Sequence, residues 1–444
     1  MKKNGYIISF IIFVIVLIIS WPLLTNQYDK QNRFYLFVKE LVPQNIKEHI
    51  KRNYLSELRS KYYEIRNNRL IEKKKSQGYQ GLLISEKYQK SENLKNKYLI
   101  KEFFLPFERL DVNLGWKATE NSKRAHYIEI IDDNIIALSG LGETIIFEKA
   151  NFKKDKLNQK IIQNNLVDLI ESSNNKFLGV RDLYYDKLDK NIYITTIIKN
   201  SKGTTLNIFR AKYNQKKLNF ELFFNLNEYF KSYSVQTGGR IEKYDGEKIL
   251  FSIGTFTEQK KAQDLKSLYG KILSIHKKTG NHELVSLGHR NPQGLFYLPK
   301  KKIIFNSEHG PKGGDEINMN KVPNKIQNFG WNISSYGIEY DGTDPYKKSH
   351  LDFGFVEPFK NFTPSIGISE IAYSHNKQKE FLYASSLRAG SIYVLEIDLK
   401  SEKILSEDRI FFKNQRIRDL KYDEENNLLF AIFELTPSIA VIKL

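Results

Sequence analysis

The most regular pattern in the sequence is a short motif, a polar residue followed by at least three strand-forming residues, that occurs six times. The first apolar residues of the six copies are Ile135, Ile192, Ile249, Ile303, Phe381 and Leu428. They are separated by 57, 57, 54, 78 and 47 residues, so one insertion between Ile303 and Phe381 accounts for the single long spacing. Strand formers dominate every copy, and self-similarity at such a period is typical of repeat folds.

Further strand-like segments flank each copy of the motif. Earlier segments, each followed by a short polar turn, begin near Tyr127, Leu183, Ile241, Leu295, Ile371 and Leu420. Later segments begin near Thr144, Leu206, Lys271, Ser391 and Ile439. A unit of three or four antiparallel strands cannot cover both of its faces alone, and stacking around an axis covers them. We therefore predict an all-β fold, a six-bladed β-propeller over residues 101–444, whose last blade is completed by a strand from around residues 102–109.

The N-terminus carries a different, continuous apolar pattern. Residues 6–24 contain no charged residue, and at about 1.5 Å per residue a helix of this length nearly spans the ~30 Å apolar core of a bilayer. No small-residue cleavage site follows the segment, and Lys2 and Lys3 before it favour a cytoplasmic N-terminus. We expect residues 1–25 to be an uncleaved transmembrane helix, so that the protein is a single-pass membrane protein whose C-terminal domain is exported to the periplasm or the extracellular space.

Residues 26–100 form a basic region between these two parts. Leu55, Leu58, Tyr62 and Ile65 have helical spacing, and the polar stretch that follows ends the pattern. We interpret the region as a short helical stalk followed by a linker. Its basic residues are either solvated or lie on anionic lipid headgroups.

Composition limits the possible chemistry. The chain has 70 basic and 51 acidic residues, a net charge of +19, and no cysteine, which excludes disulfides, thiol nucleophiles and Cys-ligated metals. The eight histidines show no paired zinc-ligand spacing, and neither a GxSxG elbow nor a P-loop is present. A basic surface can attract nucleic acid, but here Lys is abundant together with Asn and Ile, so we predict no nucleic-acid partner.

Polar residues precede the first strands of the repeat units and would meet at one axial mouth of a propeller. These residues are His126, Arg181, Gln236, Arg290, Asn291, Arg416 and Arg418. Several guanidinium groups at one cavity suit a planar ligand with several negative charges. The alternative is that these arginines form salt bridges between blades.

Three sequence strings are more specific. Residues 287–295 read LGHRNPQGL, residues 308–318 read EHGPKGGDEIN, and residues 328–331 read NFGW. They resemble the soluble glucose/sorbosone dehydrogenase family, the quinoprotein aldose sugar dehydrogenases, and the likeness extends from about Val180 to the C-terminus. The resemblance implies a six-bladed propeller that binds pyrroloquinoline quinone (PQQ) and calcium at its axial mouth and oxidises the anomeric carbon of a sugar. A simple glycine-rich loop between blades is the alternative for residues 310–314.

The resemblance also implies roles for individual residues. Those expected to contact the quinone are Arg290, Asn291, Arg388, Arg416 and Arg418, with Arg388 standing where the family usually has lysine. The backbone carbonyls of Gly310 and Pro311 are expected to bind the calcium that polarises the quinone, because this ion favours oxygen ligands. Asp315 and Glu316 lie in a stretch associated with a second, structural calcium, and Phe329 replaces the family's usual tyrosine.

One departure from the family concerns catalysis. The family abstracts the substrate hydroxyl proton with a histidine in an H-x-G-G-R string, and this chain reads Gln236-Thr-Gly-Gly-Arg240. A glutamine amide is no base near pH 7, and loss of a positioned base typically costs about 10² to 10⁴ in rate. Thr255 replaces the acidic residue expected next, and His289 and His309 are the nearby histidines that could substitute.

Two functions therefore remain open at this stage. The first is a membrane-anchored, PQQ-dependent sugar (aldose) dehydrogenase. The second is a catalytically impaired propeller that binds a sugar, a glycan or a protein partner at the same mouth. The sequence names neither the sugar nor the electron acceptor.

Overall fold

The computed structural model describes residues 81–90, 97–107, 123–232, 236–376, 379–412 and 415–444. The apolar segment 6–24 and the predicted helical stalk lie outside these residues, so both stay predictions. Within the described part of the chain, no helix is long and apolar enough to cross a bilayer.

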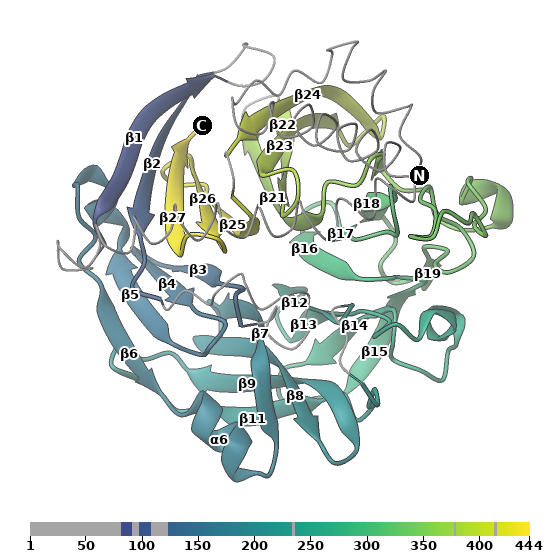
Figure 1. The fold of residues 1–444 in the computed structure, drawn as a ribbon, viewed down its shortest axis with the longest axis horizontal. Helices are drawn as coiled ribbons and strands as arrows, with labels where there is room; N and C mark the ends of the chain where they lie inside the picture. The colour runs from purple at the N-terminus through teal and green to yellow at the C-terminus, as the bar shows by residue number, and fades with distance from the viewer. Residues whose placement is uncertain (1–80, 91–96, 108–122, 233–235, 377–378, 413–414) are drawn as a thin grey trace, which may run out of the picture. The chain divides into compact units, whose positions relative to one another are not determined.

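Six mostly antiparallel sheets of the described chain surround a common axis (Figure 1). The first contains β3 (Tyr127–Ile131), β4 (Asn134–Leu138), β5 (Thr144–Glu148), β6 (Lys160–Asn164) and the short β10 (Lys217–Leu218). The second contains β7 (Lys176–Asp186), β8 (Asn191–Asn200), β9 (Gly203–Lys212) and β11 (Glu221–Asn225), and the helix α6 (Leu166–Ser172) connects the two sheets. The third contains β12 (Gly238–Lys243), β13 (Lys248–Ile253), β14 (Lys271–His276), β15 (His282–Leu287) and β19 (Gln327–Asn328).

The remaining three sheets repeat this arrangement. The fourth contains β16 (Pro292–Leu298), β17 (Ile303–Glu308), β18 (Asp315–Asn320) and β20 (Lys360–Phe362). The fifth contains β21 (Ile368–Asn376), β22 (Lys379–Ser386), β23 (Ser391–Asp398) and β24 (Lys403–Phe411). The sixth contains β25 (Ile417–Asp423), β26 (Leu428–Phe433), β27 (Ser438–Lys443), β2 (Lys97–Phe104) and β1 (Leu83–Lys90).

The first strands of the sheets form the inner ring of the propeller. Each packs against the first strand of the next sheet, in the cycle β3, β7, β12, β16, β21, β25 and back to β3 (Figure 1). The six copies of the sequence motif are the second strands, which explains their apolar character: Ile192, Tyr193 and Ile194 are consecutive and all buried, because a blade is covered on both faces by its neighbours. The prediction of a six-bladed β-propeller is confirmed.

The ring is closed by a strand from the N-terminal side of the described chain, as predicted. β2 pairs antiparallel with β27, and β1 pairs with β2 on the outside. The closing strand begins at Lys97, a few residues before the predicted position, because Ile100 and Phe103 supply the buried positions. The sheet therefore includes residues from the region predicted to be the stalk and linker, and the boundary predicted at residue 101 falls inside a strand.

A single guanidinium on the axis connects the blades. The Arg240 side chain of β12 is 3% exposed, and its Nη1 lies 2.8, 3.0 and 3.1 Å from the carboxylates of Asp182, Glu370 and Asp419. Burial raises the pKa of Asp182 to about 6 and that of Glu370 to about 8, since three buried carboxyl groups share this one cation. Arg240 also contacts the two remaining blades: the carbonyl of Gln293 accepts its Nε–H at 2.6 Å, and the ring of Tyr127 lies 5.0 Å from its guanidinium carbon. The carbonyl of Arg418, next to Asp419, accepts from its Nη2 at 3.0 Å.

Candidate active site

The candidate site lies at the end of the axis where the inner strands begin. Antiparallel pairing places the end of each second strand beside the start of its first strand: Pro292 is opposite Glu308, Ile368 opposite Ser386, and Ile417 opposite Phe433. The loops that enter first strands and leave second strands therefore share one mouth. All the residues predicted for the quinone, the calcium and the missing base lie in such loops or in the strand residues next to them.

Three of the predicted quinone ligands are joined by one chain of hydrogen bonds. The Nε of Arg416 and the Nε of Arg418 each donate to Glu434, at 2.6 Å. Nη1 of Arg418 donates to Oε1 of Gln293 at 2.9 Å, and Nε2 of Gln293 donates to Oδ1 of Asn291 at 3.0 Å. Arg418 and Asn291 are buried, whereas the side chain of Arg416 is 31% exposed. The ion pairs of these arginines lie within one blade, because Glu434 follows β26 of the same sheet.

Arg290 enters the same mouth from the fourth blade. Its Nη1 donates to the carbonyls of His309 and Gly310, at 3.0 and 2.8 Å, and its guanidinium carbon lies 5.3 Å from the ring of Trp331. The buried Nε of Arg290 has no hydrogen-bond partner among the described residues. Burial lowers the pKa of His309, Asp315 opposes this shift, and Arg290 and Arg418 add to it. The site thus keeps an unused donor on a buried cation.

Arg388 completes the predicted set but is differently placed. It follows β22, and its backbone N–H donates to the carbonyl of Ile366 at 3.0 Å. The preceding carbonyl, that of Leu387, lies 3.4 Å from Nη1 of Arg416, which brings Arg388 next to the arginine pair. The Arg388 residue is exposed. The structure therefore gathers all five predicted residues at one mouth, four of them at or just before the starts of inner strands and Arg388 on its rim.

The position of the missing base holds an uncharged network. Oε1 of Gln236 accepts from Oγ1 of Thr255 and from Nε2 of Gln259, both at 3.0 Å. Oε1 of Gln259 in turn accepts from Nε1 of Trp331 at 2.7 Å. None of these four side chains is an acid or base near neutral pH. The network can donate and accept hydrogen bonds, but it cannot take a proton from a substrate hydroxyl.

The two histidines that could replace the missing base are bound to other residues of the propeller. His289 is fully buried, and its two ring nitrogens lie 2.8 Å from Oγ of Ser286 and 3.1 Å from Oε1 of Glu308. Both nitrogens are thus engaged, and His289 is not available to a substrate. Nε2 of His309 contacts the carbonyl of Ile368.

Gly310 and Glu316, two of the three residues predicted to bind calcium, line a small cavity of about 10 Å³, room for one ion or water. Ser334 and His350 line it as well. The buried Oγ of Ser334 has no hydrogen-bond partner among the described residues, and Nε2 of His350 lies 3.5 Å from Oε1 of Glu316. Burial, and then the charge of Glu308, raise the pKa of Glu316 well above its usual range. The carboxyl group of Glu316, the hydroxyl of Ser334 and the carbonyl of Gly310 are oxygen donors of the kind that a hard cation prefers.

Backbone carbonyls would supply the other ligands. The carbonyl of Gly310 accepts one hydrogen bond, from Arg290, and therefore keeps one of its two lone pairs. The carbonyl of Pro311 accepts from Ser365 and from the backbone N–H of Gly314. No group of three His, Asp or Glu side chains that could hold a metal occurs in the described ranges. Calcium at this position would therefore depend on main-chain oxygens. Asp315 is engaged elsewhere, since its carboxylate accepts the N–H groups of Gly367 and Ile368.

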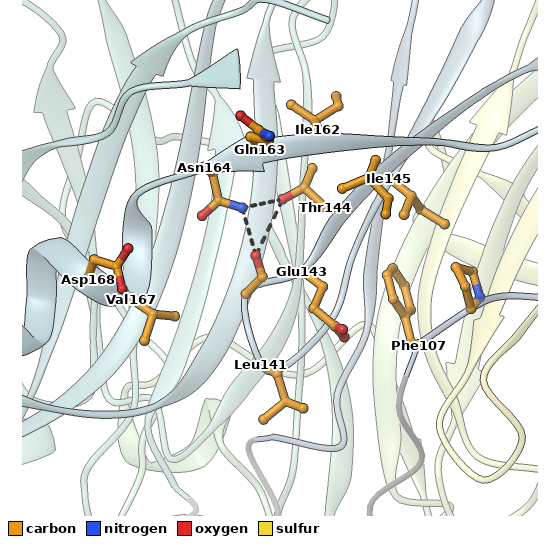
Figure 2. A pocket seen from close by; sticks show the side chains of 13 residues that line it. Phe107, Leu141, Glu143, Thr144, Ile145, Ile162, Gln163, Asn164, Val167 and Asp168 are labelled. Carbon is orange, nitrogen blue, oxygen red and sulfur yellow. Dashed lines mark hydrogen bonds between the residues drawn. The ribbon is translucent and has the colours of Figure 1, made fainter. Parts of the chain in front are cut away.

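A larger hollow lies at the first blade. It has a volume of about 360 Å³ and lies between β5, β6 and the start of α6 (Figure 2). Asn164 donates to the carbonyl of Gly142 and to Thr144 across one side of it (Figure 2). None of the predicted site residues lines it, and its charged lining residues are the carboxylates Glu143 and Asp168. This hollow does not suit an anionic cofactor.

Several residues that organise the site had no predicted role. Gln293 and Arg240 lie in the strings GHRNPQG and QTGGR, but no contact at the site was predicted for either residue. Glu434 and Gln259 had no signal of their own, because their partners are distant in sequence.

Comparisons with known proteins agree with this geometry. A sequence model of the glucose/sorbosone dehydrogenase family matches residues 171–436, more than half of the chain. Aldose sugar dehydrogenase YliI of Escherichia coli K12 is 31% identical over 204 residues, which cover 41% of this chain and 53% of that protein. Quinoprotein glucose dehydrogenase B of Acinetobacter calcoaceticus is 30% identical over 182 residues, 33% of this chain and 37% of that protein. The chain thus spans about half the length, or less, of these two curated relatives.

Solved structures share the fold. The soluble aldose sugar dehydrogenase of Escherichia coli in its apo form superposes with a TM-score of 0.59 at 20% identity, covering 72% of this chain and 96% of that one. The PQQ-bound form of aldose sugar dehydrogenase from Streptomyces coelicolor gives a TM-score of 0.53 at 18% identity, covering 72% and 93%. With the family match over the blades that carry the mouth, these findings identify the chain as a divergent member of the glucose/sorbosone dehydrogenase family.

Proposed function

We propose that the protein is a PQQ-dependent sugar dehydrogenase that oxidises the anomeric carbon of an aldose at the axial mouth. The observation that supports this most is the convergence of Arg290, Arg416 and Arg418 with Asn291 at one end of the axis, from separate segments of the chain. Guanidinium groups bind carboxylates through charge-assisted, forked hydrogen bonds. Such a cluster suits a flat anion with several carboxylates.

The protein side of the reaction would be binding and orientation. Arg416 and Arg418 would hold carboxylates of the quinone, and the unpartnered Nε of Arg290 would donate from the fourth blade. The carbonyls of Gly310 and Pro311 would hold calcium, with Glu316 at the neighbouring cavity. When bound, the quinone would accept the two electrons removed from the sugar, and the calcium would make it a better acceptor.

The uncharged network at Gln236 favours a second candidate function. Gln236 and Gln259 are partly exposed and have amide groups that match the hydroxyls of a sugar, yet they offer no base. A propeller with this site would bind a sugar, a glycan or a protein partner without oxidising it. The two proposals differ in whether the ligand bound at the mouth is oxidised.

Reconstitution of the full chain with PQQ and calcium tests both proposals. Spectral titration measures cofactor binding, and dye reduction with a panel of aldoses measures turnover. Binding with turnover supports the dehydrogenase, binding without turnover supports the second function, and no binding removes the cofactor from both. As a matched pair, Arg416→Gln should weaken PQQ binding, whereas Arg210→Gln on an outer strand, where Arg210 pairs with the exposed Glu221, should not.

The location is a separate proposal. We propose that residues 6–24 anchor the protein in a membrane and that the propeller is exported, on the strength of the uncharged apolar segment and the lysines before it. If the propeller is exported, a fusion of alkaline phosphatase to the C-terminus of the chain should be active in cells. An inactive but intact fusion would contradict the proposed orientation.

A further inference from the structure

Glu434 holds two of the proposed quinone-binding arginines at once. Glu434 directly follows β26, and its backbone N–H donates to the carbonyl of Arg416 at 3.0 Å. Its side chain is 1% exposed, with Oε2 bound to Nε of Arg416 and Oε1 bound to Nε and Nη2 of Arg418, at 2.6, 2.6 and 2.5 Å. A single carboxylate therefore fixes both guanidinium planes.

This arrangement solves a problem of charge. Two neighbouring guanidiniums repel each other, and a carboxylate between them cancels one of the two charges. Burial by itself would raise the pKa of Glu434, but Arg418, Arg416 and Arg124 hold it far below its usual range, so the carboxylate is ionised at neutral pH. The pair retains one net positive charge.

The same contacts leave hydrogen-bond donors for a ligand. A guanidinium has five N–H donors. Glu434 and Gln293 engage Nε, Nη2 and Nη1 of Arg418, while Arg416 gives its Nε to Glu434 and a long 3.4 Å contact to Leu387. Each group thus has its Nε edge fixed and keeps N–H donors beyond those contacts. The 31% exposure of Arg416 makes some of them accessible from the mouth.

We infer that Glu434 is a positioning residue, which orients Arg416 and Arg418 so that their remaining donors bind carboxylates of one multiply charged anion. That this anion is PQQ rests on the proposed function. Positioning and simple electrostatics make opposite predictions for Glu434. Removing a negative charge 2.6 Å from each arginine makes the mouth more attractive to any anion, but it releases the guanidiniums that a multidentate anion needs.

The test compares the full chain with Glu434→Gln, by spectral titration with PQQ in the presence of calcium and by calorimetric titration with citrate and acetate without calcium, because citrate chelates this ion. The variant should bind PQQ about 10- to 100-fold more weakly, the effect of one lost charged hydrogen bond. It should bind the monocarboxylate acetate no more weakly than the wild type does. Glu434→Asp, which keeps the charge, should recover part of the affinity for PQQ.

Asp423→Asn is the matched control. Asp423 is a buried carboxylate of the same blade, 5% exposed, and it pairs with Lys149 at 3.1 Å away from the arginine pair. This variant should keep the wild-type affinity for PQQ even if its melting temperature falls. If Glu434→Gln does not fold, Glu434→Asp carries the comparison and should bind PQQ more weakly than Asp423→Asn does.

The outcomes separate the inference from the proposed function. Unchanged or tighter PQQ binding by Glu434→Gln overturns the inference, as does an equal loss in Asp423→Asn. If the wild type does not bind PQQ, the proposed function fails, and the titration with the tricarboxylate citrate tests the inference. Citrate binding that is weaker in Glu434→Gln than in the wild type supports the inference. Citrate binding that is absent in the wild type, or that is tighter in the variant, overturns it.

Discussion

Replacing Arg240 with methionine should destabilise the propeller strongly, because methionine keeps the length of the side chain but not its charge. The guanidinium lies within 3.1 Å of three carboxylates whose side chains are 7% exposed or less. Removing one partner of a buried ion pair costs about 3–5 kcal/mol, since the other charge stays buried. The free energy of unfolding of a domain is about 5–15 kcal/mol in total, so this single change removes a large part of it.

The loss should depend on pH, and its sign follows from the carboxyl groups. Their pKa values in the folded protein are raised, to about 6 for Asp182 and about 8 for Glu370, so their contribution to stability is present below their unfolded values and is lost as pH rises through the folded ones. Arg240 lowers both values. Without it the carboxyls bind protons more tightly, and the variant loses more stability at about pH 8.5 than at about pH 5.5.

Urea unfolding of the full chain at these two pH values measures the effect. Arg210→Met is the control, because Arg210 pairs on an outer strand with Glu221, whose side chain is 63% exposed, and such pairs contribute less than about 1 kcal/mol. If Arg240→Met lost no more stability than Arg210→Met, or lost the same amount at both pH values, the axial carboxyls would not depend on Arg240 as described.

Three further predictions concern the base, the axis and the ring closure. Gln236→His should raise aldose-dependent dye reduction by about 10²- to 10⁴-fold, and no gain in a variant that still binds PQQ would refute the missing-base account. Glu370→Gln should flatten the fall in unfolding midpoint between about pH 6 and about pH 9, because the raised pKa of Glu370 causes part of that fall; equal slopes would contradict it. Phe103→Ala, at a fully buried position of β2, should cost about 3–5 kcal/mol in urea unfolding. Tyr88→Ala, whose residue on β1 is 65% exposed, should cost far less, and equal losses would mean that β2 adds little to the core.

The fold was predictable because the propeller covers its blades on both faces. The second strands are therefore apolar in consecutive positions, as in Ile192, Tyr193 and Ile194, and such runs repeat visibly. β1 was not predicted, because its residues 83–90 read LISEKYQK and lie at the outer edge of a sheet, where polar side chains reach water. Strand alternation there is too weak to distinguish a strand from a linker.

The site was predictable where contiguous strings carry it. Arg290 and Asn291 lie in one such string, and the structure places them at the mouth as expected. Glu434 could not be found in this way, because its role arises from two arginines on a different strand. The same holds for Gln259, which connects Gln236 to a tryptophan 72 residues away. Contacts between distant segments follow from register and loop geometry, which sequence periodicity does not specify.

The pairing of β2 with β27 has a consequence for how the protein is made. A ribosome synthesises β2 before any of the five complete blades and β27 after all of them, so β2 waits through most of translation without its partner. During that time its backbone edge is open to other strands, which is a route to aggregation. Only a chain that has been translated through β27 can protect this edge, so the edge stays open in any fragment that ends before β27.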